Sequence, residues 1–205
     1  MMKLLLTTLV ATAICTPNVG FCKDPDPSWA SQKGITAGTL IEKSQSPDGK
    51  LALFEFFYWD GDTPNTAMTS SGIGLAPLDR SKLLIDTGSR TKWATNKEVP
   101  SFLTFLWNPD STLLATHDSL SKHSKLNVFC VTKTGVTSLD IPDILKIAST
   151  KLGIDSSTIT ASGQLPARWI QARALEITVR MKSPRGKYVK NFILDFHDDG
   201  TITAR

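Results

Sequence analysis

The stretch Ser46-Pro47-Asp48-Gly49-Lys50-Leu51-Ala52-Leu53 returns in altered form as Asn108-Pro109-Asp110-Ser111-Thr112-Leu113-Leu114-Ala115. Proline fixes φ at the first central position of a tight turn, aspartate suits the second, and glycine or serine closes it. A strand-like segment precedes each copy and an apolar strand follows it, so each copy predicts a β-hairpin. A repeated unit of this kind indicates a propeller or an array of small sheets.

The residues after each turn follow the same order: a strand, a polar loop, and two further strands joined by a turn. In the first unit the segments are 51–59, 60–71, 73–78 and 83–86, and in the second they are 113–116, 117–125, 126–132 and 136–141. With the strand before the turn, each unit predicts a small antiparallel sheet.

These units resemble the WD-like β-propeller repeats with S-P-D-G turns that occur in TolB-type periplasmic propellers. The resemblance rests on Ser46–Lys50, Asn108–Ser111 and Leu126–Val136, and it covers residues 38–141. It implies blade-like sheets that serve as a binding platform. A propeller needs at least about four blades of ~40 residues to close. The chain offers two clear units and an imperfect third echo at Ser183–Lys187, so we do not expect a ring within one chain.

The C-terminal part predicts one helix and a second kind of sheet. Residues 142–152 place Ile144, Leu145, Ala148 and Leu152 on one helical face, and Gly153 suits the C-terminal cap. Strands follow at 168–171, 174–182, 188–196 and 201–204. The predicted fold is therefore mostly β: two propeller-blade-like antiparallel units, a linking helix, and a C-terminal antiparallel sheet, with 38–141 and 142–205 forming one compact domain.

The N-terminus has the layout of a secretory signal peptide. Lys3 precedes the apolar run Leu4–Ile14, which is shorter than the ~20 residues of a transmembrane helix. We expect cleavage after Cys22, which leaves 1–22 as signal peptide, 23–37 as linker, and a periplasmic or secreted protein. A net charge of +4 is too small to indicate a nucleic-acid partner. Cys130 then remains as the single cysteine, and its strand-like surroundings favour a small buried hydrophobe over a nucleophile.

One stretch looks like a protease active site. Asp86-Thr87-Gly88-Ser89 follows three apolar residues, as in the active-site loop of pepsin-type aspartic proteases, and Trp93 falls where many of them carry a tryptophan. That chemistry needs two carboxylates sharing a proton, so a single copy would have to dimerise. The alternative interpretation, that Asp86–Ser89 ends the last strand of the first unit, is favoured because the chain has no second Asp-Thr/Ser-Gly.

Two polar loops contain histidines. His117, Asp118 and His123 lie in one, and His197-Asp198-Asp199 in the other. Their spacing matches no known metal pattern, so we expect solvated loop residues, no metal and no cofactor. A metal-dependent hydrolase that uses the His117 loop remains an alternative hypothesis.

A basic hairpin tip is the last candidate. Lys182, Arg185 and Lys187 flank the predicted turn at 183–187. They could bind an anionic partner, although charges of this kind also discourage edge-to-edge pairing of sheets. The favoured functional hypothesis is a non-catalytic exported binding or scaffold protein of the cell envelope, whose partner is another envelope protein or a glycan. The aspartic protease dimer around Asp86 is the second hypothesis.

Overall fold

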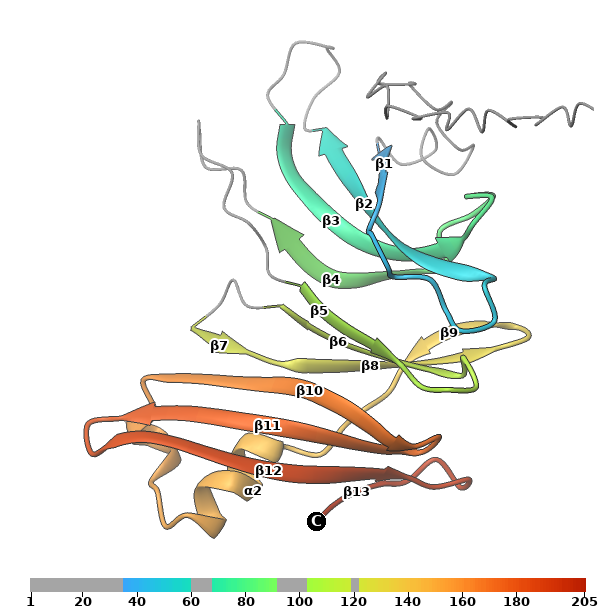
Figure 1. Ribbon diagram of the computed structural model, residues 1–205. Helices are drawn as coiled ribbons and strands as arrows, with labels where there is room; N and C mark the ends of the chain where they lie inside the picture. The colour runs from blue at the N-terminus through green and yellow to red at the C-terminus, as the bar shows by residue number, and fades with distance from the viewer. Residues whose placement is uncertain (1–34, 60–67, 92–102, 119–121) are drawn as a thin grey trace, which may run out of the picture.

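The computed structural model describes residues 35–59, 68–91, 103–118 and 122–205. In this part of the chain the protein is mostly β, with three sheets stacked along the molecule and one α-helix (Figure 1). This confirms the predicted fold class. The predicted signal peptide lies outside the described residues.

The first two sheets are antiparallel meanders of four strands each, with neighbours in sequence paired in space. Sheet 1 consists of β1 (Ile35–Leu40), β2 (Leu51–Trp59), β3 (Met68–Pro77) and β4 (Ile85–Thr91). Sheet 2 consists of β5 (Leu103–Trp107), β6 (Leu113–Asp118), β8 (Leu126–Thr132) and β9 (Gly135–Ser138). Both predicted units therefore form small sheets of the expected order.

The third sheet repeats this order and gains one extra strand. It consists of β10 (Ala161–Gln171), β11 (Ala174–Ser183), β12 (Gly186–Phe196) and β13 (Ile202–Ala204). The two-residue strand β7 (His123–Ser124) lies between β6 and β8 in the sequence, but it pairs in parallel with β10 of sheet 3. The sheet is linked to sheet 2 by α2 (Ile144–Lys151) and the short 3₁₀ turn η1 (Ser156–Thr158). Asp143 caps α2 by accepting a hydrogen bond from the Lys146 backbone N–H at 3.0 Å.

The two quoted turns have the same hydrogen bonds although their sequences differ. The backbone N–H of Ser46 donates to the Leu51 carbonyl at 2.8 Å, and the Ser46 hydroxyl accepts from the Leu51 N–H at 3.1 Å. In the second turn Asn108 makes both bonds with Leu113, at 3.0 and 2.8 Å. The serine hydroxyl oxygen and the asparagine side-chain oxygen thus accept equivalent hydrogen bonds from the backbone.

The aspartates of these turns are also equivalent. Asp48 and Asp110 each accept a hydrogen bond from the backbone N–H two residues later, at 3.2 and 3.0 Å. The next residue adopts a left-handed conformation in both turns, with φ of 71° at Gly49 and 62° at Ser111. Glycine takes this conformation freely, whereas serine does so at a cost.

Hydrogen bonding in the turns accounts for most of the perturbed carboxyl groups. The hydrogen bond from Ser46 is the main cause of the lowered pKa of Asp48. Burial acts to raise the pKa of Asp110, but hydrogen bonds from Thr112 and Asn108 outweigh it and the pKa is lowered. The same turn bonds lower the pKa of Asp79 and Asp199. These shifts mark turns and give no support to an active site.

A tryptophan joins each sheet to the one before it. The indole N–H of Trp107 donates to the Ser44 carbonyl at 2.9 Å, and that of Trp169 donates to the Leu106 carbonyl at 3.1 Å. The two donors are 62 residues apart (169 − 107) and so are the two acceptors (106 − 44). The third sheet is therefore packed like a further copy of the repeat. Its turn after the first strand is the short link between β10 and β11.

The predicted third echo at Ser183–Lys187 was misplaced. Ser183 pairs directly with Gly186 in a tight hairpin between β11 and β12, so this turn has no counterpart of the Asp48 hydrogen bonds. The tryptophan marks the repeat here, and the S-P-D-G pattern does not.

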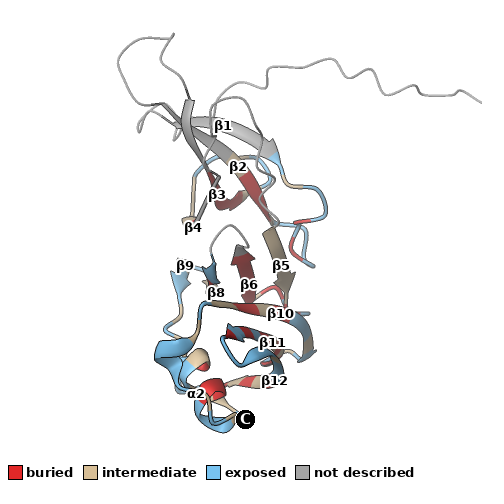
Figure 2. Cartoon of the chain, turned by 90° about the vertical axis from the view of Figure 1, so that its left-hand side faces the viewer, coloured by how far each residue is buried: buried red, intermediate tan, exposed pale blue. Residues whose placement is uncertain are grey.

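Two apolar cores fill the spaces between the sheets. The first lies between sheets 1 and 2, and its buried residues are Leu53, Ile73, Leu75, Leu114 and Phe129. The second joins sheet 2, α2 and sheet 3, and it includes Leu113, Val128, Ile144, Ala148, Ile177, Phe192 and Leu194. Neighbouring residues of β6 thus face opposite cores, and both faces of sheet 2 are covered. Figure 2 shows buried segments in the interior and exposed turns outside.

We predict that Trp169→Phe lowers the free energy of unfolding by about 1–2 kcal/mol, because the Leu106 carbonyl loses its donor inside a sheet interface. Urea denaturation measures the change. Ile170→Val is the matched control, since Ile170 is the next residue of β10 and is 44% exposed. A loss no larger than that of the control would contradict the assigned role of the indole.

Candidate functional site

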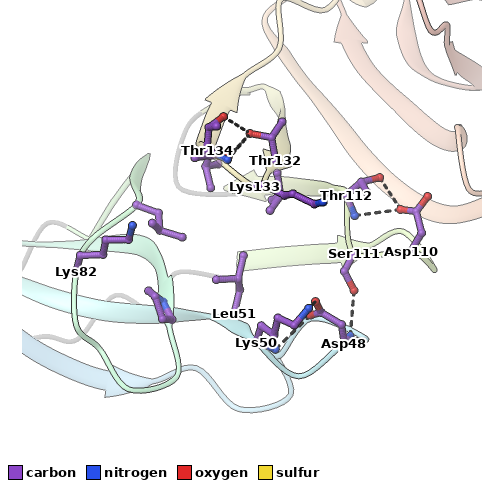
Figure 3. A pocket seen from close by; sticks show the side chains of 15 residues that line it. Asp48, Lys50, Leu51, Lys82, Asp110, Ser111, Thr112, Thr132, Lys133 and Thr134 are labelled. Carbon is purple, nitrogen blue, oxygen red and sulfur yellow. Dashed lines mark hydrogen bonds and ion pairs between the residues drawn. The ribbon is translucent and has the colours of Figure 1, made fainter.

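A groove of about 740 Å³ lies between sheets 1 and 2 (Figure 3). Apolar side chains form part of it, among them Leu51, Leu84, Val131 and Val136. Lysines from both sheets and the hydroxyls of the β8–β9 turn surround them, as Figure 3 shows for Lys50, Lys82, Lys133, Thr132 and Thr134.

The charges of this groove are mixed. Lys50 pairs with Asp48 at 3.2 Å, whereas Lys82 and Lys133 have no ion-pair partner in the described part of the chain. Asp48 and Asp110, whose pKa values are lowered, line the same groove. A groove with both signs of charge does not select one class of ligand.

A second candidate lies on the outer face of sheet 3. Lys182 and Lys187 are directly opposite each other on β11 and β12, and Arg180 is opposite Val189 one pair further along. Side chains alternate between the faces of a strand, so these four point to the same side. Together with Lys122 they line a hollow of about 270 Å³, which we call the basic surface.

The cations of the basic surface are not neutralised. Among the described residues, Lys122, Arg180, Lys182 and Lys187 have no ion-pair partner. At their centre Val189 is 62% exposed, a large value for an apolar side chain in the middle of a sheet strand.

The structure contradicts the interpretation of these lysines as guards of a sheet edge. The strand order β13-β12-β11-β10-β7 places β11 and β12 inside the sheet, where each has two neighbours. Arg185, the third predicted cation, is exposed in the hairpin turn and does not line the basic surface.

The expectation that His117 is a solvated loop residue is wrong. β6 continues through Asp118, and His117 is 3% exposed with its Nε2 2.8 Å from the Ser124 hydroxyl oxygen. His123 is exposed, and its Nδ1 lies 3.1 Å from the Ser162 hydroxyl oxygen. Asp118 ends the strand, and its side chain lies outside the described residues. The loop residues are thus divided between the interior and the surface.

The other predicted residues lie in strands or, for His197, just after one. Asp86 pairs with Gly74 within β4, which runs to Thr91, so the predicted end of this strand at Asp86 was too early. Thr87 is buried and donates to the Ile73 carbonyl at 2.7 Å. Cys130 lies in β8, half-buried against the second core. His197 bonds to the Thr203 hydroxyl at 3.0 Å.

The described side chains contain no group of three or more histidine, cysteine, aspartate or glutamate residues arranged to hold a metal ion. None of the helices in this part of the chain has the length and hydrophobicity that a membrane span requires. A scan against family models finds no match to the chain, and comparison with curated proteins finds no significant similarity.

Close packing around His117 explains why β10 carries a glycine. A Cβ at Gly163 would lie 3.3 Å from the Ser124 hydroxyl oxygen and 3.8 Å from His117 Nε2. We predict that Gly163→Ala destabilises the protein by about 1 kcal/mol through this overpacking. Thermal unfolding of Gly163→Ala in the wild-type and Ser124→Ala backgrounds tests it.

The added methyl should cost less when the Ser124 hydroxyl is absent, since the two changes act on the same contact. Equal losses in both backgrounds would show that the glycine is required for another reason.

Proposed function

We propose that the protein is a non-catalytic, exported binding protein that uses the basic surface to hold an acidic partner protein of the cell envelope. The observation that carries this proposal is the directly opposed pair Lys182 and Lys187, which lies on interior strands. Like charges directly opposite each other destabilise a sheet. Both strands lie inside the sheet, so protection of a sheet edge does not account for the two lysines. A bound surface rich in carboxylates would relieve the repulsion between them.

The apolar centre of the basic surface favours a protein as the partner. Val189 is 62% exposed and lines the hollow among these cations. Binding energy at protein interfaces concentrates in apolar or aromatic residues surrounded by polar ones. The surrounding cations would speed association with an acidic surface and orient it.

The repeated sheets support the same class of function. Three small sheets whose consecutive strands pair antiparallel, joined by equivalent contacts, are compatible with propeller blades. We infer a relation to the S-P-D-G repeats of TolB-type propellers, in which such sheets form binding platforms. This inference rests on the fold and turn pattern, whereas the basic surface supplies the argument about a site.

Export is a separate part of the proposal. We predict that the mature protein, recovered outside the cytoplasm, begins near Lys23 because the signal peptide is cleaved after Cys22. N-terminal sequencing of the recovered protein checks this. Recovery with Met1 still present, or with a lipid on Cys22, would contradict it.

For binding, we predict that the wild-type protein binds poly-L-glutamate at low salt and that Lys182→Glu with Lys187→Glu weakens this by at least about tenfold, because repulsion replaces attraction. Fluorescence anisotropy with labelled poly-L-glutamate measures the affinity. Lys133→Glu with Lys146→Glu makes the same change of net charge elsewhere on the protein and should bind nearly as well as the wild type.

Equal losses in the two double variants would show that net charge alone drives binding. Binding of heparin but not of poly-L-glutamate would replace the acidic protein with an acidic glycan. In a pull-down from the envelope fraction, proteins bound by the wild type should be missing from the Lys182→Glu and Lys187→Glu double variant.

A further inference from the structure

The last strand of sheet 2 has an open edge. In the order β5-β6-β8-β9, the strand β9 has β8 as its only neighbour within the described part of the chain. An open edge is a template for pairing with another extended chain, and proteins block such edges with charged residues, proline, bulges or short strands. β9 is short, but it contains neither a charged residue nor a proline, and its pairing with β8 has no bulge.

Two residues of β9 direct their backbone groups toward this edge. Residues opposite each other in an antiparallel pair either exchange both hydrogen bonds or turn both away. Val131 lies opposite Val136, and its N–H is turned away from β9, since it donates to the Thr112 carbonyl at 2.8 Å. The N–H and C=O of Val136, and by alternation those of Ser138, therefore point to the open edge, where no described residue bonds them.

The open edge borders the groove between sheets 1 and 2. Val136 lines the groove, and its half-buried side chain packs against the first core. Side chains directly opposite each other in neighbouring strands lie on the same face of a sheet. A strand added to β9 would therefore place every second side chain in the groove, next to Val136 and facing Leu51 and Leu84. The groove has a volume of about 740 Å³, within the range of about 300–1,000 Å³ that is usual for ligand sites.

The charges that remain available in the groove are positive. Asp48 and Asp110 already accept side-chain hydrogen bonds within their own turns, at 2.6 and 2.7 Å. Lys82 and Lys133 have no ion-pair partner in the described chain, and Figure 3 shows them on the sheet 1 side and the β8–β9 side of the groove. An acidic residue in a bound segment would complement them. Charge alone does not select a ligand here, but the open backbone edge selects an extended peptide.

We propose that this groove receives an extended segment of a partner protein, which pairs with β9 as an antiparallel fifth strand of sheet 2. Apolar residues of the segment alternate with polar ones and enter the groove, and an acidic residue on the same face reaches Lys82 or Lys133. In recognition of this kind, main-chain hydrogen bonds supply affinity and pockets for alternate side chains supply specificity. No residue of the groove belongs to the basic surface, so this inference goes beyond the proposed function and does not depend on it.

The probe for the test is the peptide acetyl-Thr-Val-Thr-Val-Thr-Glu-Thr-amide, titrated into the ¹⁵N-labelled wild-type protein. In an antiparallel pair, the peptide residue that lies opposite Val136 also exchanges both backbone hydrogen bonds with it. N-methylation of the two valines keeps their side chains but removes these bonds, and should weaken binding by at least about tenfold. N-methylation of the threonines that follow the valines adds the same methyl groups to N–H groups that point to solvent, and should leave binding intact.

Amide hydrogen exchange locates the bound strand. The peptide should slow exchange at the N–H groups of Val136 and Ser138, which are free without it, whereas a purely electrostatic contact would not protect them. Two exposed substitutions test the charges: Lys82→Glu with Lys133→Glu should weaken peptide binding severalfold. Lys182→Glu with Lys187→Glu makes the same change of net charge on the basic surface and should leave peptide binding intact, even though it removes binding to poly-L-glutamate.

Three results would each overturn the proposal. The first is that millimolar peptide gives no protection at Val136 and Ser138. The second is that the peptide with N-methylated valines binds as well as the unmodified one. The third is that Lys182→Glu with Lys187→Glu reduces peptide binding as much as Lys82→Glu with Lys133→Glu, because the peptide would then occupy the basic surface.

Discussion

The contact on which the stack depends is the hydrogen bond from a tryptophan indole to a backbone carbonyl of the preceding sheet. Trp107 makes it with Ser44 and Trp169 with Leu106. An indole N–H must find an acceptor when it leaves water, and a large ring buries much apolar area around that bond. The tryptophan therefore fixes both the direction and the spacing of neighbouring sheets.

A second contact links the turns of neighbouring sheets. The Asp48 N–H donates to the Ser111 hydroxyl, and the Asn108 side chain donates to the Ala172 carbonyl.

Given these contacts, the sequence between them can vary widely. The first two turns preserve their hydrogen bonds with serine in one and asparagine in the other, because only an oxygen at a fixed position is needed. In the third sheet the turn between β10 and β11 is short, but Trp169 is present and makes the equivalent hydrogen bond. The packing of sheet against sheet thus constrains the chain more strongly than the turn motif does, which explains how three sheets of similar arrangement arise from segments of low mutual similarity.

The sequence predicted the fold class, the four-strand order of the first two units and the helix, because turn chemistry and apolar periodicity are local. It predicted the start of β10 poorly, since Gly163 and Pro166 are uncommon in strands. Both have a structural reason: Gly163 leaves room for Ser124 and His117, and Pro166 lies next to a shift in register. The basic residues were noticed, but whether they guard an edge depends on strand order.

The outer face of sheet 3 is unsuited to packing against a further sheet. On it, the residue equivalent to Leu106 is Arg168, whose side chain pairs with Glu176 at 2.7 Å. A fourth sheet packed there would have to bury this ion pair together with Arg180 and Lys182, and removing charges from water costs several kcal/mol per ion. A partner that supplies carboxylates would meet the same charges with the opposite sign, which supports the proposal that this face binds an acidic surface.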